Sequence, residues 1–299
     1  MRQMRRLAFI AFLVTGMLAV SSCAADMRNT SVPTDYVIQQ ADRSEMPDEI
    51  KAIYDSGRLT IGSKFDQPLT GFRDEATGRI TGFDAEIGRI LAQRIFGEVA
   101  EGDNLFFVET VSSSREKYIQ NGTVDMVVAT YSMTDDRKDE VDYAGPYFTT
   151  GQAVMVDANS GIKKITDLAG KDICTVKGSE SSKLIKQKAP DAKFNDPMRD
   201  YSSCKEAVLN GEADAMSTDD TILHGYATQY PDELEVLDGT LTDEKYGIGL
   251  PHNSPELRKF VNDTLEEIYE NGDWKTAFSL TLETGGIEMP EEPPTLDRY

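Results

Sequence analysis

The chain has 299 residues, enough for one large or two ordinary domains, and its 31 Lys and Arg against 52 Asp and Glu give a formal net charge of −21. This acid excess argues against the basic face on which nucleic-acid binding depends, and against attachment to an anionic membrane surface by charge. An anionic ligand would have to be held by a local basic cluster that works against the overall field.

The N-terminus has the layout of an export signal. Three arginines precede an apolar run of 14 residues from Leu7 to Val20, which is too short to span a bilayer comfortably and is typical of a secretory leader. Two serines then lead to Cys23, and small residues before a cysteine resemble a bacterial lipobox, whose cysteine carries the lipid. We predict that residues 1–22 are removed and that Cys23 anchors the protein outside the cytoplasmic membrane. The alternative is an ordinary signal peptide with a chance cysteine.

The other two cysteines form an even pair. In an exported protein, Cys174 and Cys204 are expected to make a disulfide. A zinc site would need more ligands, and the chain has only His224 and His252 to add. A catalytic Cys–His pair stays open as an alternative, but no motif supports it. We expect no metal and no cofactor.

Helices and strands alternate after the leader. Residues 23–47 are polar and irregular, which predicts a flexible tether. Apolar spacing and glycine stops then predict helices over 48–56 and 83–95 and strands over 58–63 and 104–109.

The run from Arg115 to Tyr147 carries the clearest candidate site. An apolar strand at 126–129 is followed by the hydroxyls of Thr130 and Ser132, and then by a helix start that contains Arg137. Small ligands bind at such strand ends in α/β sheets, and a guanidinium beside hydroxyls is a receptor for a carboxylate. The alternative is a surface turn with a solvated arginine.

A second α/β unit follows an extended passage at 146–156. Its strand at 171–176 ends in a turn, Ser179-Glu180-Ser181, whose N–H groups could face an anion, and its strand at 213–218 ends in Asp219. A further extended passage at 246–250 leads back to helices at 254–268 and beyond 272. Two α/β lobes joined by two β crossovers, with polar strand ends facing each other, predict a hinged clamp.

At this point the chain resembles the family 3 solute-binding proteins of amino-acid ABC transporters. The resemblance runs from Arg58 to the region of Trp274 and rests on five stretches: GFDAEIGRILAQRI at 82–95, NGTVD at 121–125, the run around Arg137 to Phe148, GEADA at 211–215 and YGIGL at 246–250. One departure is Ala85, where a larger aliphatic residue is usual. The sequence looks most like Gram-positive glutamate-binding lipoproteins, which also pair a cysteine before the second-lobe turn with one in the following helix.

The resemblance implies the α/β periplasmic-binding-protein (Venus flytrap) type II fold. Lobe 1 would comprise residues 48–149 and 246–285, lobe 2 residues 150–245, and residues 286–299 would form a loose acidic tail. It also implies a monomeric, lipid-anchored receptor, palmitoylated at Cys23, that delivers an amino acid to an ABC permease and catalyses no reaction.

Site residues follow from the same resemblance. Arg137 and Ser132 would hold the α-carboxylate of the ligand near the backbone of Thr130. The turn formed by Ser179, Glu180 and Ser181 would add contacts from lobe 2. Asp219 would take the α-ammonium, because an unpaired buried charge costs several kcal/mol; helix capping is its alternative role.

Specificity would come from two further cations. Lys64 follows the first strand, and Arg115 stands where relatives that bind acidic amino acids also carry an arginine, so L-glutamate is the expected ligand, with aspartate or glutamine next. The alternative for both cations is a surface ion pair, which contributes little. Phe65 and Phe83 would wall the pocket, although Phe83 could equally be a core residue.

Two other functional classes remain. Some proteins of this fold resemble dehydratases, but no general acid or base stands out in the predicted cleft. A sensory module for a signalling partner is the other alternative, although no transmembrane or kinase segment follows the clamp in this sequence.

Overall fold

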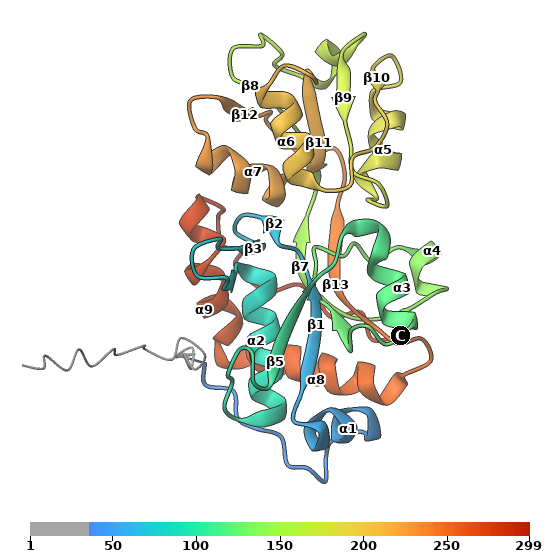
Figure 1. Ribbon diagram of the computed structural model, residues 1–299, viewed down its shortest axis with the longest axis vertical. Helices are drawn as coiled ribbons and strands as arrows, with labels where there is room; N and C mark the ends of the chain where they lie inside the picture. Colours follow the sequence, from blue (N-terminus) through green and yellow to red (C-terminus); the bar gives the residue numbers. More distant parts are fainter. Residues whose placement is uncertain (1–35) are drawn as a thin grey trace, which may run out of the picture.

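The computed structural model describes residues 36–299, and these form two α/β lobes stacked along the long axis of the molecule (Figure 1). Each lobe contains one five-stranded sheet with helices packed against it. The predicted leader and Cys23 lie outside the described residues.

Lobe 1 is built on a mixed sheet with the strand order β5-β1-β6-β13-β7. Strand β1 pairs in parallel with β5 and β6, whereas β13 pairs antiparallel with β6 and β7. All five residues of β1 are buried, as expected for an inner strand covered on both faces. The strands are β1 (Leu59–Ser63), β5 (Leu105–Glu109), β6 (Met126–Val127), β7 (Asp142–Thr150) and β13 (Glu244–Leu250).

Helices and one small sheet complete lobe 1. Helix α2 buries Ile87, Leu91 and Ile95 in a core that also contains Trp274, and α8 adds Leu257 and further apolar residues of the same face. The helical elements are α1 (Asp48–Ser56), α2 (Phe83–Phe96), η1 (Ser112–Ser114), α3 (Arg115–Gln120), α4 (Asp135–Lys138), α8 (Pro255–Asn271), α9 (Asp273–Leu280) and η3 (Glu283–Gly285). The small sheet contains β2 (Asp66–Gln67), β3 (Gly71–Arg73) and β4 (Ile80–Thr81).

Lobe 2 has a sheet with the order β10-β9-β11-β8-β12 and a separate core on each face. Alternate residues of β8 divide between the two cores, because successive side chains of a strand point to opposite faces. The strands are β8 (Gln152–Asp157), β9 (Asp172–Cys174), β10 (Lys193–Phe194), β11 (Ala215–Asp219) and β12 (Leu234–Val236). The helices are η2 (Ile165–Leu168), α5 (Ser181–Lys188), α6 (Tyr201–Leu209) and α7 (Asp220–Gln229). Cys174 and Cys204 form the predicted disulfide, which joins β9 to α6.

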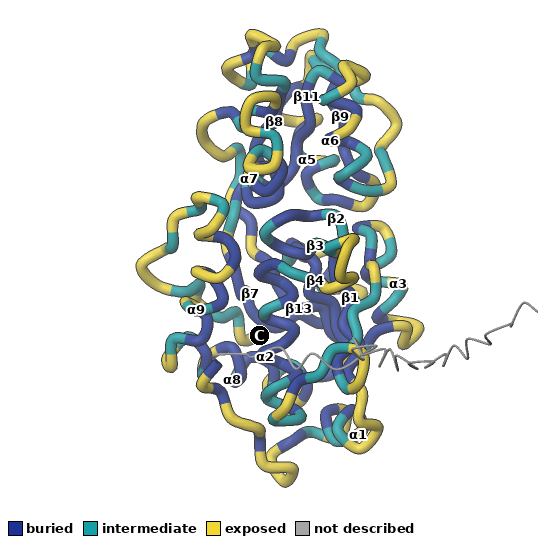
Figure 2. The backbone as a smooth tube through the Cα atoms, turned by 60° about the vertical axis from the view of Figure 1, so that its left-hand side comes forward, coloured by how far each residue is buried: buried dark blue, intermediate teal, exposed yellow. Residues whose placement is uncertain are grey.

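Two β crossovers connect the lobes. Strand β7 leads into β8 through Gly151, and β13 returns beside β7 with Glu244 opposite Thr150. A Cβ atom on Gly151 would lie 2.3 Å from the carbonyl oxygen of Thr242, so the two crossovers approach more closely there than any other residue allows. Figure 2 shows the strands of both lobes as buried and the outer loops as exposed.

The segment before α1 is not a tether in its described part. The N–H groups of Val37 and Ile38 donate to the carboxylate of Asp273 at 2.7 and 2.8 Å. The side chains of Tyr36, Ile38, Ala41 and Met46 lie in the core of lobe 1. The predicted tether over 23–47 is therefore wrong for residues 36–47, because these scattered apolar residues, too few to make a sequence pattern, are buried against α2 and α9.

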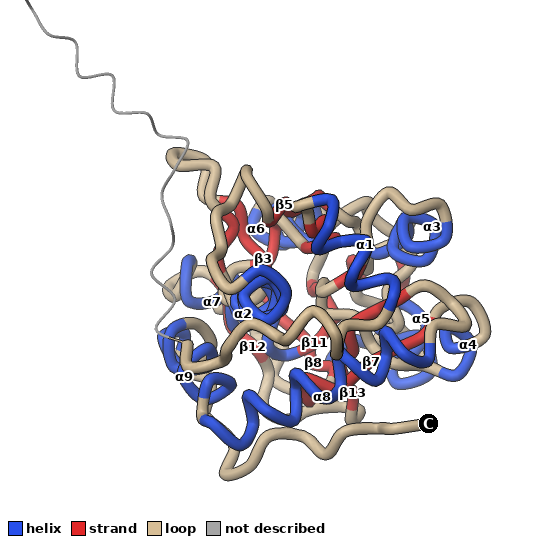
Figure 3. The backbone as a smooth tube through the Cα atoms, turned by 90° about the horizontal axis from the view of Figure 1, so that it is seen from below, coloured by secondary structure: helices blue, strands red, loops and turns tan. Residues whose placement is uncertain are grey.

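The predicted loose tail is also wrong. Residues 286–299 run alongside α8 to the C-terminus (Figure 3), and Ile287, Met289 and Leu296 pack against the core of lobe 1. Prolines and glutamates dominate the composition of this segment, but its three apolar side chains are enough to fix it to the lobe.

Candidate functional site

Buried charged side chains gather where the two lobes meet. Lys64, Arg115 and Arg137 from lobe 1 are only 2%, 2% and 8% exposed, and Asp219 from lobe 2 is 4% exposed. Charged groups are rarely buried unless they are paired or functional. The sequence identified all four residues as candidates, and the fold brings them to the same interface.

Lys64 follows β1 directly and is enclosed by both lobes. Its Nζ donates to Ser112 Oγ at 2.9 Å and lies 5.5 Å from the centre of the Tyr201 ring in lobe 2. Burial, reinforced by the nearby Arg115 guanidinium, lowers the pKa of Lys64 to about 7. Lys64 is therefore not part of a surface ion pair. It is a buried cation whose positive charge is only partly compensated by its surroundings.

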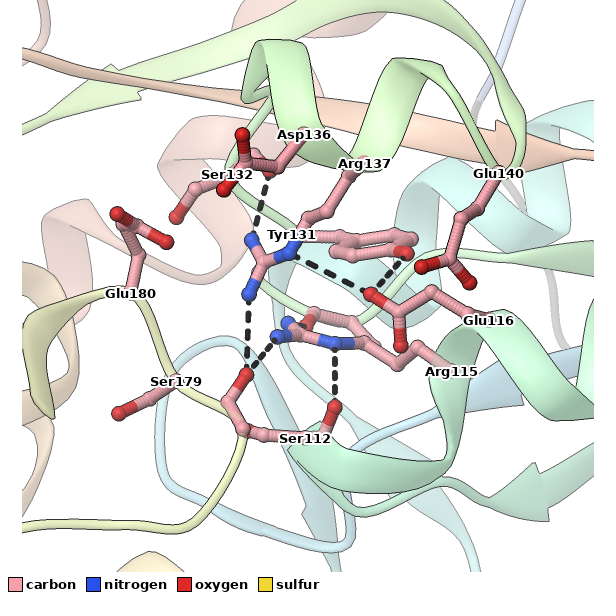
Figure 4. Close-up of polar contacts among 12 residues, drawn as sticks. Ser112, Arg115, Glu116, Tyr131, Ser132, Asp136, Arg137, Glu140, Ser179 and Glu180 are labelled. Carbon is pink, nitrogen blue, oxygen red and sulfur yellow. Dashed lines mark hydrogen bonds and ion pairs between the residues drawn. The ribbon is translucent and has the colours of Figure 1, made fainter. Parts of the chain in front are cut away.

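Arg115 and Arg137 flank one aromatic ring. Their Cζ atoms lie 4.3 and 5.0 Å from the centre of the Tyr131 ring. Tyr131 in turn donates its hydroxyl to Glu116 at 2.7 Å, and Glu116 lies 3.4 Å from Arg137 Nε (Figure 4). This arrangement fixes both guanidinium groups before any ligand arrives.

Both guanidinium groups also point at one oxygen atom of lobe 2. The carbonyl oxygen of Gly178 accepts from Arg115 Nη2 at 3.3 Å and from Arg137 Nη2 at 3.0 Å. The expected division of roles, with Arg137 on one carboxylate and Arg115 on another, is thus not built into their positions, because a single carboxylate can reach both.

Gly178 allows this close approach of the lobes. Its φ is +77°, and a Cβ atom would lie 2.6 Å from the Cα atom of Ser113 in lobe 1. A side chain would therefore be both strained and obstructed there.

Asp219 ends β11 and faces the return crossover. Its Oδ2 accepts from the Tyr246 hydroxyl at 2.5 Å, and burial, together with the nearby Glu244 carboxylate, raises the pKa of Asp219 well above its usual value. Glu244 in turn accepts from Ser132 Oγ at 2.7 Å. Ser132 is therefore buried at the interface as predicted, but its hydroxyl is already bonded to a carboxylate.

Asp84 fixes the strand end that carries Thr130. It accepts from the Thr130 N–H at 2.8 Å and from the Tyr147 hydroxyl at 2.6 Å. Burial raises the pKa of Asp84 to about 6, although the Tyr147 hydrogen bond opposes that shift. Thr130 has a φ of +43°, a costly conformation for a β-branched residue, and the carboxylate of Asp84 helps to hold it.

The predicted turn of lobe 2 satisfies most of its own hydroxyl groups. Ser179 Oγ donates to the Val176 carbonyl at 2.7 Å, and Ser181 Oγ donates to Thr218 Oγ1 at 3.3 Å. Glu180 lies 3.3 Å from Lys183 Nζ and lines an interlobe pocket of about 640 Å³ that Ser132 and Glu244 also line. Lobe 2 therefore offers the Gly178 carbonyl and the Asp219 carboxylate more directly than the serine hydroxyls.

Neither predicted pocket-wall aromatic lies in this cluster. Phe83 is a core residue whose ring centre lies 5.8 Å from Trp274 and 6.0 Å from Phe278. Phe65 is half-buried on the flank of lobe 1, where it lines a groove with Phe106 and its ring lies 5.7 Å from Arg73 Cζ. The pocket-wall prediction is wrong for Phe65, whereas for Phe83 the alternative of a core residue is confirmed, because each ring has its partners away from the interface.

The two lobes are in direct contact. Asp66 Oδ2 accepts from the N–H groups of Tyr201 and Ser202, at the start of α6, at 2.8 and 3.3 Å. Its carbonyl oxygen accepts from the Tyr226 hydroxyl at 2.5 Å. These bonds join β2 to two helices of lobe 2, so the described conformation is closed.

Sequence reasoning missed four residues of the site. Asp84 lies inside the motif at 82–95, and Tyr246 lies inside the predicted return crossover, so both could have been found there. Glu244 precedes that crossover, and Tyr131 stands between two residues that were singled out. Of Asp84 and Tyr246, Asp84 had the clearer local sign of function, because its carboxylate lies in the first turn of a helix.

The described residues contain neither a cluster suited to a metal ion nor a helix suited to a membrane. Between residues 36 and 299, no group of three or more His, Cys, Asp or Glu side chains is placed to hold a metal ion. In the same part of the chain, no helix is both long enough and apolar enough to cross a membrane.

Comparison with known proteins places this geometry in a family. Residues 59–279 match the bacterial extracellular solute-binding proteins, family 3. The chain is 36% identical to the glutamate-binding protein GluB of Corynebacterium efficiens over 84% of this chain and 87% of that protein. It is 32% identical to the ABC transporter glutamine-binding protein GlnH of Bacillus subtilis over 83% of this chain and 90% of that protein.

Solved structures give the same result. The solute receptor for L-cysteine of Neisseria gonorrhoeae aligns with a TM-score of 0.74 at 27% identity, covering 81% of this chain and 97% of that one. The ancestral amino-acid-binding protein AncCDT-1, a precursor of cyclohexadienyl dehydratase, aligns with a TM-score of 0.69 at 27% identity, over 77% and 97% of the two chains. The predicted type II fold and the predicted resemblance are both confirmed. The chain belongs to family 3 of the bacterial extracellular solute-binding proteins.

Proposed function

We propose that the protein is the extracytoplasmic receptor of an amino-acid ABC transporter and that it binds L-glutamate between its lobes. The observation that carries the proposal is the separation of buried charge, with Lys64, Arg115 and Arg137 on lobe 1 and Asp219 on lobe 2. Glutamate has one ammonium group and two carboxylates, so its charges complement this set. Two relatives are named for binding glutamate and glutamine.

The α-carboxylate is assigned to Arg137, with Thr130 and Ser132 beside it. The Gly178 carbonyl already fills an acceptor position against two guanidinium groups, and a carboxylate is a stronger acceptor at the same position. Asp219 is assigned to the α-ammonium, because a cation beside it would compensate the burial that now disfavours its charged form. The turn from Ser179 to Ser181 closes over the ligand from lobe 2.

The side-chain carboxylate is assigned to Lys64, and Arg115, whose guanidinium can reach either carboxylate of the ligand, assists it. The burial that lowers the Lys64 pKa means that its charge lacks a full counterion in the unliganded protein. A second ligand carboxylate supplies that counterion, whereas the neutral amide of glutamine does not. This difference favours glutamate over glutamine, and aspartate would have to bridge the same charges with a shorter side chain.

Transport follows from the two-lobed construction. Ligand binding between the lobes stabilises the closed form, and a membrane permease takes the ligand from it, with no covalent step. A lipid on Cys23 would keep the receptor at the outer face of the membrane. Replacing Cys23 by alanine should then release the protein from membranes into the medium, and retention at the membrane would contradict the anchor.

A thermal-shift panel of the amino acids tests the ligand. A ligand that binds only the folded state raises the unfolding temperature, and L-glutamate should raise it most. The R137A variant provides the control, because at the same ligand concentration its unfolding temperature should respond much less to every amino acid. A larger shift with a basic or an apolar amino acid would overturn the assignment of Lys64 and Arg115 to a ligand carboxylate.

A further inference from the structure

The last three residues of the chain attach to the outer strand of lobe 1. Strand β7 is the edge strand of its sheet, so one side of it is free to accept other partners. The N–H of Asp297 donates to the Gly145 carbonyl at 2.8 Å, and the N–H of Tyr143 donates to the Tyr299 hydroxyl at 3.0 Å. The C-terminal residues thus cover the outer edge of β7 near its start, shortly after the end of α4.

Tyr299 also lies between two cations. Its ring centre is 4.6 Å from Lys138 Nζ and 4.1 Å from Arg258 Cζ. Lys138 pairs in addition with the Asp297 carboxylate at 3.0 Å. The side chain of Lys138 is therefore held twice by the C-terminal residues.

Lys138 is the last residue of α4, the helix that carries Arg137. Helix α4 has four residues, and a helix of this length is unstable unless tertiary contacts hold it. Arg137 needs a fixed position, because its guanidinium must reach Ser132, Glu116 and the opposing lobe at once. The contacts of Lys138 with the C-terminal residues therefore also fix the position of Arg137.

We propose that Asp297 and Tyr299 act as a strap that positions α4, so that Lys138 and Tyr299 set the affinity of the site without touching the ligand. The strap acts through Arg137 and rests on the proposed binding of an amino acid at that residue. Lys138 and Tyr299 are positioning residues, and their effect applies to every ligand that uses Arg137.

The chain provides its own control for a purely structural role. Arg298, between the two strap residues, pairs with Asp263 at 2.8 Å and with Glu266 at 2.9 Å. Both partners belong to α8 and not to α4. Loss of Arg298 loosens the tail from α8 while the contacts of Lys138 remain.

The experiment compares Y299A, K138A, Y299F and R298A in the full-length chain. Calorimetry with L-glutamate and with L-glutamine measures affinity, and hydrogen exchange of the unliganded protein measures protection of residues 135–143. We expect Y299A and K138A to raise the Kd for both ligands by about 3-fold to 10-fold, as the loss of a cation–π contact and a partly buried ion pair would. Y299F keeps the ring but loses the hydroxyl that accepts from the Tyr143 N–H, so it should raise the Kd less than Y299A does, and R298A should change the Kd less than about 2-fold.

Two outcomes overturn the proposal. One is an unchanged Kd in both Y299A and K138A, and the other is an equal increase in R298A, which would reduce the tail to a general contribution to stability. Hydrogen exchange separates this proposal from the choice of ligand. If neither ligand binds the wild type, faster exchange over 135–143 in Y299A but not in R298A still supports the strap, and unaltered exchange overturns it.

Discussion

The two faces of the interface differ in the sign of their buried charge. Lobe 1 presents Lys64, Arg115 and Arg137, whereas lobe 2 presents the carbonyl of Gly178 and the carboxylate of Asp219. The lobe 1 cations are braced within their own lobe by Tyr131 and Ser112, so that face is ordered before closure. Lobe 2 supplies acceptors that reach these cations only when the lobes meet.

Under the proposed function, this difference gives the two lobes separate tasks. A preformed cationic face can capture the carboxylates of a ligand in the open state, because its order costs no further entropy at binding. The acidic face then completes the charge balance on closing. Substitutions in lobe 1 should therefore affect capture, and those in lobe 2 should affect closure.

The largest effect is expected from R137A. Arg137 is buried and braced, and removing one partner of a buried charge pair costs about 2–5 kcal/mol, so the affinity for every amino acid should fall by about 30-fold or more. Calorimetry with L-glutamate and L-glutamine measures the loss. K163A is the control, because Lys163 is an exposed cation of lobe 2 paired with Glu235, and it should bind as wild type does. Retained affinity in R137A would remove Arg137 from the ligand.

D219N should lower affinity while it stabilises the unliganded protein. The folded-state pKa of Asp219 is raised, chiefly by burial and then by Glu244, so its ionised form destabilises the fold at neutral pH and the neutral amide removes that cost. We expect a loss of affinity of about 10-fold to 100-fold with an unchanged or higher unfolding temperature.

D214N, at the residue directly before β11, should have the opposite effects on stability and affinity. Burial of Asp214 is outweighed by hydrogen bonds from Asp172 N–H and Lys171, and its pKa is lowered. Its carboxylate therefore stabilises the fold at neutral pH, and D214N should lower the unfolding temperature but keep the affinity. If D219N behaves like D214N, Asp219 is a structural residue and not the ammonium partner.

K64M should change selectivity more than affinity. Lys64 faces the interface without a carboxylate at hydrogen-bond distance among the described residues. Loss of its amine should therefore weaken the binding of glutamate more than the binding of glutamine. The Kd ratio between glutamate and glutamine should rise by about 10-fold, which is the effect of a charge-assisted hydrogen bond. Equal losses for the two ligands would assign Lys64 to the shared part of the amino acid.

The parts that the sequence predicts correctly depend on local patterns. The helix at 83–95 and the strand at 58–63 repeat apolar residues at helical spacing or in a short buried run, and both appear as α2 and β1. Lys64 could be identified because it directly follows a strand, and Arg137 because it lies in the first turn of the helix that comes after the next strand end. The disulfide followed from an even cysteine count in an exported chain.

The parts that were missed depend on contacts between distant residues. Glu244 meets Ser132 across 112 positions of sequence because the return crossover brings β13 beside the strand end. Tyr299 reaches Lys138 only after the tail has passed along α8. Phe83 appears in a motif beside the site, but its ring turns to Trp274. No local pattern distinguishes these outcomes, because each is set by packing across the fold.

The smallest and most specific effect concerns pH. Lys64 faces Arg115 and Arg137 as well as the carboxylates of Asp66 and Asp84, and its pKa lies near 7 without ligand. Binding of a carboxylate requires the protonated amine, so the affinity for glutamate should fall above pH 7, by no more than about 10-fold per pH unit. Between about pH 7 and 10.5 the unfolded chain holds this proton more firmly than the folded one, so Lys64 also makes the unliganded protein more stable as pH rises.

The ratio of the Kd values for glutamate and glutamine between pH 6 and 9 isolates the contribution of Lys64. Titration of Asp219 and Asp84 affects the binding of both ligands, so its effect cancels in this ratio. A ratio that does not change with pH in the wild type, or one that changes equally in K64M, would show that Lys64 does not read the ligand side chain.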